Sequence, residues 1–279
     1  MLKITPAEIK SVGKYIHDIS GIHLDPSKSY LFETRLGSIV EEHGCSSYDE
    51  LHLKAKRDAS KRIERQIIDA ISTNETLFFR DTGPFELLKN KILPEMIDLR
   101  APSSPRLKTT IKIWSAASST GQELYSVAMT IRDLLGSQLD SYNFRLLGTD
   151  ISDSAVKQAS YGKYNKFEIE RGLPKTTLQK YFTLFGDSWK VKDELRAMVN
   201  FRKLNLMLPF TGLGKHDIIL CRNVAIYFTL QDRKKLFNKL ADCLADDGYL
   251  IIGSTESLTG VCSRFIPKRH LRSIFYQKK

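Results

Sequence analysis

Apolar residues in the first quarter of the chain recur every three or four positions, which is the period of an amphipathic helix. The first such face contains Val12 and Ile16 and lies between the capping box Thr5-Pro6-Ala7-Glu8 and Gly21. Similar patterns predict helices over about 27–43 and 60–71, and Ser47 and Glu50 cap another helix between them. No strand pattern interrupts them, so residues 1–72 are predicted to form a small all-α domain.

Further along, strand patterns alternate with helix patterns. Ile111, Ile113 and Trp114 predict a strand, small residues follow from Ser115 to Thr120, and a helical spacing begins after Gly121. Further strands are predicted over Phe144–Ile151, Val199–Leu206, Asp217–Cys221 and Tyr249–Ser254. Helices are predicted over Ser152–Ser160 and over Asp232–Leu244, and Gly248 is expected to end the second of these. Arg264–Ile266 and Ser273–Tyr276 are predicted to form a closing hairpin. The fold class is therefore α/β, with a mostly parallel sheet that has an antiparallel end.

One region breaks this alternation. Residues 161–198 are rich in aromatic residues and contain short strand-like pieces such as Trp189–Lys192. We interpret them as a small β-subdomain inserted into an α/β domain that spans residues 73–279. The Pro-rich stretch Ala101–Pro105 is expected to be an exposed loop before the first strand of the sheet.

The first strand–turn–helix unit is a candidate cofactor site. Its small side chains let backbone N–H groups approach a ligand at a helix N-terminus. Asp150 ends the next strand, where Rossmann-like folds hold ribose hydroxyls. The turn has one glycine where the dinucleotide fingerprint has three, which argues against a pyrophosphate site. The pattern indicates a nucleoside-containing cofactor; the alternative is an ordinary βα turn with Asp150 as a helix N-cap.

Polar residues also follow other predicted strands. Asn205-Leu206 and Arg222-Asn223 stand at strand ends, and ligands of open α/β sheets bind at the carboxyl ends of the strands. Separately, the stretch Ser72–Asp81 joins the helical domain to the next helix. Its apolar run Leu77–Phe79 is suited to burial and would hold Arg80 in a fixed place. The alternative is a hydrophobic linker closed by a solvent-facing arginine.

The charge is unevenly distributed. The chain of 279 residues has a net charge of +11, yet residues 1–72 hold 11 basic and 11 acidic side chains. The last sixteen residues, Arg264–Lys279, contribute six positive charges and no acid. A basic surface fits an acidic partner such as nucleic acid, a membrane or an acidic protein segment; for the tail, a solvated basic face is the alternative.

Other features exclude some classes of protein. The four cysteines form no CxxC pair and the six histidines form no HxH or HExxH motif, so we expect no metal. Apolar runs are strand-length and the N-terminus lacks a signal-peptide pattern, so we expect no membrane insertion and a cytoplasmic location. We find no RNA-binding module and expect no nucleic-acid partner.

Four motifs carry a family resemblance: STNETLFFR, WSAASSTGQELYS, GTDIS and CRNVAIYF, in this order. Together they resemble the CheR family of chemotaxis-receptor methyltransferases, over nearly the whole chain. The resemblance implies a Rossmann-like S-adenosylmethionine methyltransferase domain with a small β-subdomain, preceded by a helical domain for receptor docking. It also implies methyl transfer to glutamate side chains on the cytoplasmic helices of chemoreceptors, which yields glutamate methyl esters and S-adenosylhomocysteine for sensory adaptation.

The resemblance also assigns residues. The cofactor-binding set is Asn74, Thr76, Arg80, Glu123, Asp150, Asn205, Leu206, Arg222 and Asn223. Within it, Glu123 is expected beside the methionine part, Asp150 at the ribose, and Asn205 and Leu206 at the adenine. Arg80 and Tyr227 are the catalytic candidates. Because a glutamate carboxylate is already ionised near neutral pH, we assign both to orientation and not to proton transfer. Tyr227 could instead be a core aromatic.

Two features bear on partners. Lys28 and Arg35 are basic residues of the second helix, but the helical domain is neutral overall, which leaves the docking face open. The insertion is short around Phe185–Trp189 and lacks the Gly-rich extension of members that bind a receptor's C-terminal pentapeptide, so we expect no such tether. Two alternatives remain: a methyltransferase with another acceptor, such as RNA or another protein, or a non-catalytic S-adenosylmethionine-binding signalling module.

Overall fold

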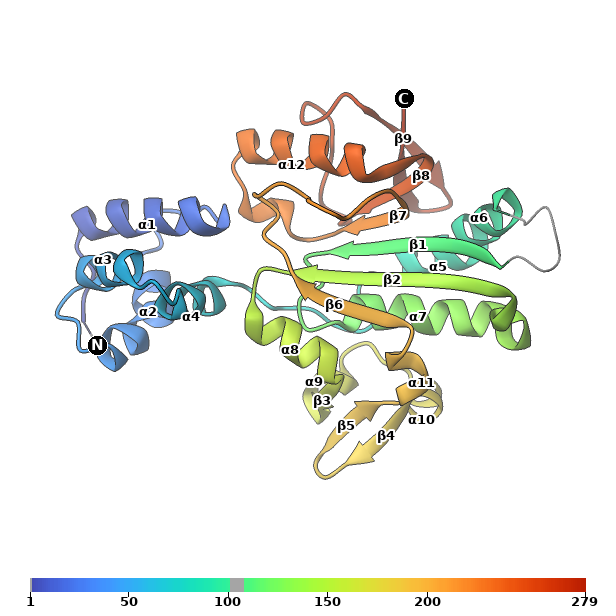
Figure 1. Ribbon diagram of the computed structural model, residues 1–279, viewed down its shortest axis with the longest axis horizontal. Helices are drawn as coiled ribbons and strands as arrows, with labels where there is room; N and C mark the ends of the chain where they lie inside the picture. The colour runs from blue at the N-terminus through green and yellow to red at the C-terminus, as the bar shows by residue number, and fades with distance from the viewer. Residues whose placement is uncertain (1, 101–107) are drawn as a thin grey trace.

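Four helices open the chain. The structure, a computed structural model, describes residues 2–100 and 108–279. The helices are α1 (Pro6–Ser20), α2 (Ser29–Glu42), α3 (Tyr48–Arg57) and α4 (Arg62–Ile71), and they enclose a hydrophobic core of their own at one end of the molecule (Figure 1). Their limits follow the sequence signals: Thr5 and Glu8 form the predicted capping box, Gly21 ends α1 in a left-handed conformation, and Ser47 caps α3.

A seven-stranded sheet forms the centre of the remaining chain, in the order β6-β2-β1-β7-β8-β10-β9. The strands are β1 (Thr109–Ala116), β2 (Tyr142–Asp150), β6 (Val199–Lys203), β7 (His216–Cys221), β8 (Leu244–Ile252), β9 (Phe265–His270) and β10 (Ser273–Lys278). The first five in spatial order are parallel, whereas β10 runs antiparallel to both β8 and β9. The predicted mostly parallel sheet with an antiparallel end is confirmed.

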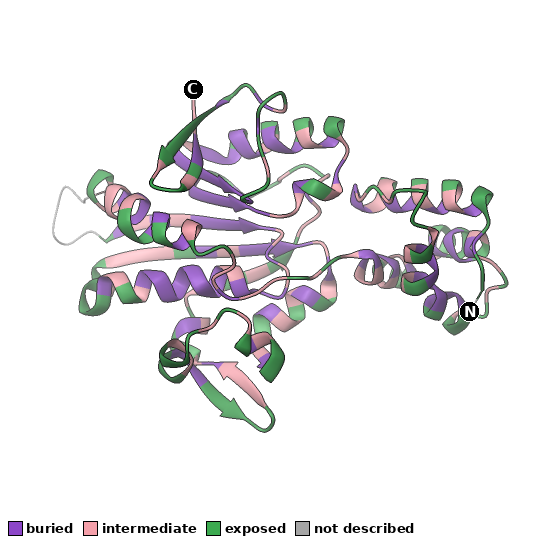
Figure 2. Ribbon diagram, turned by 180° about the vertical axis from the view of Figure 1, so that it is seen from behind, coloured by how far each residue is buried: buried purple, intermediate pink, exposed green. Residues whose placement is uncertain are grey.

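Helices cover both faces of this sheet. They are α5 (Gly83–Leu87), the π-helical turn η1 (Leu88–Ile92), α6 (Leu93–Leu99), α7 (Gln122–Leu135), the 3₁₀ turns η2 (Gly136–Ser141) and η3 (Ala225–Tyr227), α8 (Asp153–Tyr161) and α12 (Leu230–Cys243). Along β7, Ile218 and Leu220 join the core beneath α5–α7, while Ile219 and Cys221 join the core beneath α12. Because successive strand residues face opposite sides, both faces of β7 are buried, as Figure 2 shows for the central strands.

The predicted small β-subdomain lies between α8 and β6. Its strands, β3 (Lys163–Asn165), β4 (Phe182–Phe185) and β5 (Ser188–Val191), form an antiparallel sheet in the order β3-β5-β4. Three short helices complete it: α9 (Lys166–Glu170), α10 (Lys175–Tyr181) and α11 (Asp193–Arg196). It projects from the side of the molecule that carries β6 and α8, and most of its strand residues are exposed or half-buried (Figures 1 and 2).

Several predicted limits were wrong. Helix α12 ends at Cys243, one residue before the predicted Leu244, but Gly248 is not its stop signal. Strand β8 begins at Leu244 and not at Tyr249, because His216 and Leu244 already pair across β7 and β8. Gly248 lies inside that strand, where an added Cβ would lie 2.9 Å from the carbonyl oxygen of Asp217. The strand predicted to reach Leu206 ends at Lys203, because its pairing partner β2 ends at Asp150, opposite Lys203. The closing hairpin is longer than predicted, and the loop predicted over Ala101–Pro105 lies outside the described residues.

No helix within the described parts of the chain, residues 2–100 and 108–279, has both the length and the apolar character needed to cross a bilayer.

Candidate active site

A cavity lies at the carboxyl ends of the central parallel strands, where ligands of open α/β sheets bind. Segments far apart in the sequence meet there, including nearly all of the predicted site residues. Those on its wall are Asn74, Thr76, Arg80, Glu123, Asp150, Leu206, Arg222, Asn223 and Tyr227. Ser20 and Ile22, from the end of α1, also line it, so the helical domain supplies part of the wall.

Asp150 stands at the end of β2, as predicted. Its carboxylate accepts backbone hydrogen bonds from Ser119, at 2.8 Å, and from Ser152, at 3.0 Å. Burial raises the pKa of Asp150, and these N–H donors act in the opposite direction. The N-cap of α8 is Ser152, whose hydroxyl accepts the backbone N–H of Ala155, so the N-cap alternative for Asp150 was wrong. The carboxylate oxygens retain acceptor positions for hydroxyl groups of a ligand.

The turn between β1 and α7 brings backbone close to the cavity. Ala117 and Ser119 have positive φ, 62° and 49°, which is uncommon for residues other than glycine and marks a constrained turn. Gly121 has φ 97°, and an added Cβ would lie 2.9 Å from the Cβ of Ala159, so glycine is required there. The buried Ser118 hydroxyl has no hydrogen-bond partner among the described residues, and Ser118 lines the cavity. The sequence predicts this turn as a whole, but not Ser118 and Ser119 individually.

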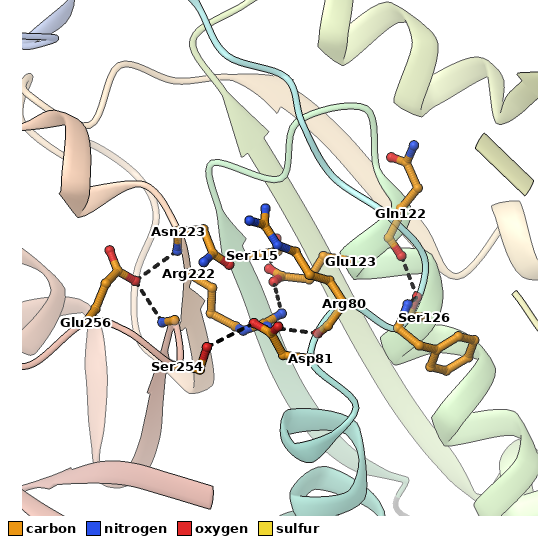
Figure 3. A network of polar contacts seen from close by, with 12 residues as sticks. Arg80, Asp81, Ser115, Gln122, Glu123, Ser126, Arg222, Asn223, Ser254 and Glu256 are labelled. Carbon is orange, nitrogen blue, oxygen red and sulfur yellow. Dashed lines mark hydrogen bonds and ion pairs between the residues drawn. The ribbon is translucent and has the colours of Figure 1, made fainter. Parts of the chain in front are cut away.

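Arg222 is the centre of a buried ionic network (Figure 3). Its side chain is 1% exposed and donates from Nη1 to Glu123, at 2.8 Å, and from Nη2 to Asp81, at 3.0 Å. Nη2 also donates to the carbonyl of Arg80, and Ser115 donates to the other oxygen of Glu123. A buried cation needs such partners. The Nε of Arg222 is left without a partner among the described residues, and Arg222 lines the cavity.

Asn223 follows Arg222 with a positive φ of 57°. Glu256, in the loop after β8, holds this backbone: one of its oxygens accepts the N–H groups of Asn223, at 2.9 Å, and of Gly253, at 2.7 Å (Figure 3). Sequence analysis missed Asp81 and Glu256 as supports of the site. For Glu256 the available signal was its position just after a strand of the parallel sheet.

The segment before α5 holds Arg80 as expected. Phe78 is fully buried and makes edge contacts with Tyr164 and Phe182, at 5.0 and 5.4 Å between ring centres. The backbone N–H of Phe79 donates to the hydroxyl of Ser126. Arg80 itself donates to the carbonyl of Glu75 at 2.9 Å. Within residues 2–100 and 108–279 it forms no ion pair, so its guanidinium has donors free for a carboxylate.

Tyr227 and Asn205 are placed differently. Tyr227 lies on the short turn η3, is half-buried and lines the cavity. Asn205 is absent from the cavity wall: its amide donates to the carbonyl of Ile19 at 2.9 Å and its side-chain oxygen accepts the N–H of Met207 at 2.8 Å. The side chain of Asn205 therefore joins the end of α1 to the cavity rim, which differs from the expected contact with adenine.

Comparison with known proteins identifies the family. The family model described as "CheR methyltransferase, SAM binding domain" matches residues 74–271, and "CheR methyltransferase, all-alpha domain" matches residues 7–72. This chain belongs to the CheR methyltransferase family. As a family member it is an S-adenosylmethionine-dependent methyltransferase, with S-adenosylmethionine as its cofactor.

Curated relatives of this CheR-family chain match it over nearly its whole length. Chemotaxis protein methyltransferase Cher2 of Pseudomonas putida is 38% identical, over 95% of both chains. A chemotaxis protein methyltransferase of Vibrio parahaemolyticus is 38% identical, over 100% of this chain and 99% of its own. Chemotaxis protein methyltransferase 1 of Vibrio cholerae is 39% identical, with the same two coverages.

The polar groups of the cavity fit the cofactor of CheR methyltransferases. S-adenosylmethionine has ribose hydroxyls, which suit the acceptors of Asp150, and an amino-acid end with both charges. The Glu123 carboxylate can accept hydrogen bonds from the ammonium group of that end, and the unpaired Nε of Arg222 can donate one to its carboxylate. The apolar side chains of Leu204 and Leu206 offer a surface for a base.

Proposed function

We propose that this enzyme transfers the methyl group of S-adenosylmethionine to glutamate side chains of chemoreceptors, the methyl-accepting chemotaxis proteins, in sensory adaptation. One observation carries the proposal: a cavity suited to this cofactor has, on its wall, an arginine without a carboxylate partner in the described chain. That residue, Arg80, is suited to holding an incoming carboxylate. The names of the curated relatives are consistent with this acceptor.

The proposal gives each residue of the site a role. Asp150 holds the ribose, and Leu206 borders the adenine. Glu123 and Arg222 hold the amino-acid end of the cofactor. The remaining members of the predicted set, Asn74, Thr76 and Asn223, complete the cavity wall, and Asn205 supports the rim through its bonds to Ile19 and Met207.

The chemistry needs orientation more than proton transfer. When bound, S-adenosylmethionine supplies a methyl group on a positively charged sulfur. The carboxylate oxygen of the acceptor forms the new C–O bond as the C–S bond breaks, so the products are the glutamate methyl ester and S-adenosylhomocysteine. A glutamate is ionised near neutral pH and needs no general base. Arg80 holds the carboxylate by hydrogen bonds and Tyr227 donates another, so both residues act by orientation.

We propose that the partners of the enzyme are the cytoplasmic helices of chemoreceptors and that the enzyme acts in the cytoplasm. The proposal includes no nucleic-acid partner and no insertion into the membrane. We further propose the division into a receptor-docking domain, 1–72, and a catalytic domain, 73–279. A C-terminal pentapeptide tether is not part of the proposal: strands β4 and β5 are joined by the two-residue turn Gly186-Asp187, without a longer extension. Measurable binding of a receptor C-terminal pentapeptide would contradict that part.

The reaction is tested with radiolabelled S-adenosylmethionine and membranes that contain chemoreceptors. Carboxyl methyl esters hydrolyse in base and release volatile methanol, whereas N-methyl and ring-methyl products do not. We expect base-labile label on the receptor band, and none with heat-inactivated enzyme. Base-stable label on RNA or on another protein would indicate a different acceptor. Cofactor binding without any transfer would indicate a non-catalytic module.

A further inference from the structure

A groove of about 1610 Å³ lies beside the active-site cavity, between the start of α5 and the turn of the β9–β10 hairpin. Asp81 and Glu256 line this groove, and each also holds a residue of the cavity wall. Asp81 pairs with Arg222 at 3.0 Å, and Glu256 accepts the backbone N–H of Asn223 at 2.9 Å. Side chains that line the groove therefore contact residues of the cavity wall directly, and Figure 3 shows Asp81 beside Arg222 and Glu256 beside Asn223.

The sheet topology places the hairpin turn at this edge. Strand β10 runs antiparallel to β8, with Tyr276 opposite Leu250, so β10 begins beside the carboxyl end of β8. Its first residue, Ser273, packs against the start of α5, where an added Cβ on Gly83 would lie 2.8 Å from the Ser273 hydroxyl. The turn residues, Leu271 and Arg272, thus lie at the edge of the sheet where the cavity opens.

Two basic residues at the far end of the hairpin have acidic partners, whereas several others, including the groove-lining Arg272, have none among the described residues. Arg264 pairs with Asp242, at 2.7 Å, and Lys278 with Asp246, at 3.0 Å. Lys268 and Arg272 are exposed, and neither has an acidic partner within 4 Å in residues 2–100 and 108–279. Their positive charges are therefore available to a partner.

Apolar side chains accompany these charges. Leu271 is 70% exposed and Ile274 is 56% exposed, and both line the groove next to Arg272. Exposed apolar side chains gathered beside a groove are typical of an interaction surface. Three carboxylates line the groove. Asp81 and Glu256 are already engaged with Arg222 and with backbone N–H groups, which reduces their repulsion of an acidic partner, whereas Glu86 is exposed and has no basic partner among the described residues.

We propose that this groove and the turn of the β9–β10 hairpin dock an acidic, amphipathic helix of the methyl-accepting protein. The inference rests on the proposed function and deepens it. The acceptor residues are glutamates, so the segment that carries them is acidic and complements Arg272 in the groove and Lys268 on strand β9 of the same hairpin. Its apolar side packs on Leu271 and Ile274, in the helix-in-groove mode of recognition. A concave groove fits a helix better than it fits a flat anionic membrane.

The receptor-docking domain, residues 1–72, has no net charge that would attract an acidic partner. Of the two basic residues associated with α2, Arg35 donates to the carbonyl of Ile71 and to the hydroxyl of Thr73 at 3.1 Å, so its guanidinium supports the segment that leads into the cavity. The positive charge of the chain therefore acts on the partner from the catalytic domain.

The test measures methylation of a soluble cytoplasmic receptor fragment by the full-length enzyme and by the double variant Lys268→Glu/Arg272→Glu. We expect KM for the fragment to rise at least about tenfold, because two attractive charges become repulsive, while kcat stays within about twofold. The dissociation constant for S-adenosylhomocysteine should not change. The matched control is Lys157→Glu, an exposed lysine on α8 outside the groove, which should keep the wild-type KM.

Each other outcome has a definite meaning. If the wild type methylates the fragment and the double variant keeps its KM, the docking surface is wrong while the proposed function stands. If the wild type does not methylate chemoreceptors at all, the proposed function fails first. Binding of the wild type to phosphatidylglycerol vesicles, lost in the variant without a change in KM, would assign the hairpin to the membrane and overturn the inference. If the double variant binds S-adenosylhomocysteine poorly, the single variant Arg272→Gln is measured in its place. A raised KM for the fragment would then support the docking surface, and an unchanged KM would overturn it.

Discussion

The carboxylate of Asp150 is held at the end of β2 by the backbone N–H groups of Ser119 and Ser152. We predict that Asp150→Ala raises the dissociation constant for S-adenosylmethionine by roughly 10- to 100-fold, because hydrogen bonds to a charged acceptor contribute about 1.5–3 kcal/mol. Calorimetric titration measures this constant. The matched control, Asp140→Ala, removes an exposed aspartate just before β2 and should leave affinity unchanged. Equal affinities for the two variants would contradict the ribose role.

Arg80 contributes little to the fold, because within residues 2–100 and 108–279 its side chain hydrogen-bonds only the carbonyl of Glu75. We predict that Arg80→Ala lowers kcat by about 100-fold or more while the melting temperature stays within a few degrees. Arg80→Lys should recover only part of the rate, because lysine keeps the charge but lacks the planar fork. The control is Arg171→Ala, which removes the neighbouring ion pair with Glu75, at 3.0 Å. A wild-type rate for Arg80→Ala would refute its role.

Tyr227 is predicted to orient the carboxylate by one hydrogen bond. Tyr227→Phe should therefore lower kcat by roughly 3- to 10-fold, the effect of losing about 0.5–1.5 kcal/mol. The backbone carbonyl of Tyr227 accepts the N–H of His23, and this contact survives the change. Tyr161→Phe removes an exposed hydroxyl and serves as the control in the same steady-state assay. A loss beyond about 1,000-fold would mean that the hydroxyl takes part in the chemistry itself.

At the scale of elements, the strand β7 begins with a buried histidine. His216 is 4% exposed and packs against Trp114, and burial together with Lys112 lowers its pKa from 6.5 to about 4. The folded state therefore binds fewer protons than the unfolded chain between these values. The stability linked to His216 is fully present above about pH 6.5 and is lost as the pH falls toward 4.

We predict that His216→Gln flattens the dependence of unfolding free energy on pH in that window, by roughly 1–3 kcal/mol between pH 6.5 and 4.5. Urea titrations of both proteins at several pH values measure the difference in slope. Return to pH 7 should restore the wild-type midpoint, which excludes irreversible acid damage. Parallel slopes for the two proteins would contradict the assignment of acid sensitivity to His216.

Elements with both an apolar period and a stop signal were predictable from the sequence. Helix α1 has a capping box at one end and a glycine at the other, and its limits agree with the prediction. Helix α12 ends within one residue of its predicted limit, but β8 begins at Leu244 and not at the predicted Tyr249, because the chain passes from Cys243 to Leu244 without a loop. The polar residues Asp246 and Asp247 lie in an exposed part of that strand, which a period of alternating residues does not predict. Pairing with β7 overrides the local sequence there.

At the scale of the whole molecule, the cavity combines parts of the chain that local patterns cannot place together. His17 of α1 contacts Asp232 of α12 at 2.8 Å, and the amide of Asn205 donates to the carbonyl of Ile19. The rule that ligands bind at the carboxyl ends of parallel strands correctly placed Glu123, Asp150 and Arg222 in one site, because that rule follows from sheet topology. It could not assign the direction of the Asn205 side chain or the contribution of α1 to the wall, since both depend on how the helical domain packs.

The most direct measurement is tandem mass spectrometry of a chemoreceptor fragment after incubation with the enzyme and S-adenosylmethionine, compared with a reaction that lacks the enzyme. We predict a mass increase of about 14 Da, one methyl group, on peptides where fragmentation assigns it to a glutamate side chain. Brief treatment with base should remove it, because the product is an ester. A base-stable increase on lysine, arginine or a ring nitrogen, or no increase while the enzyme still binds the cofactor, would contradict the proposed reaction.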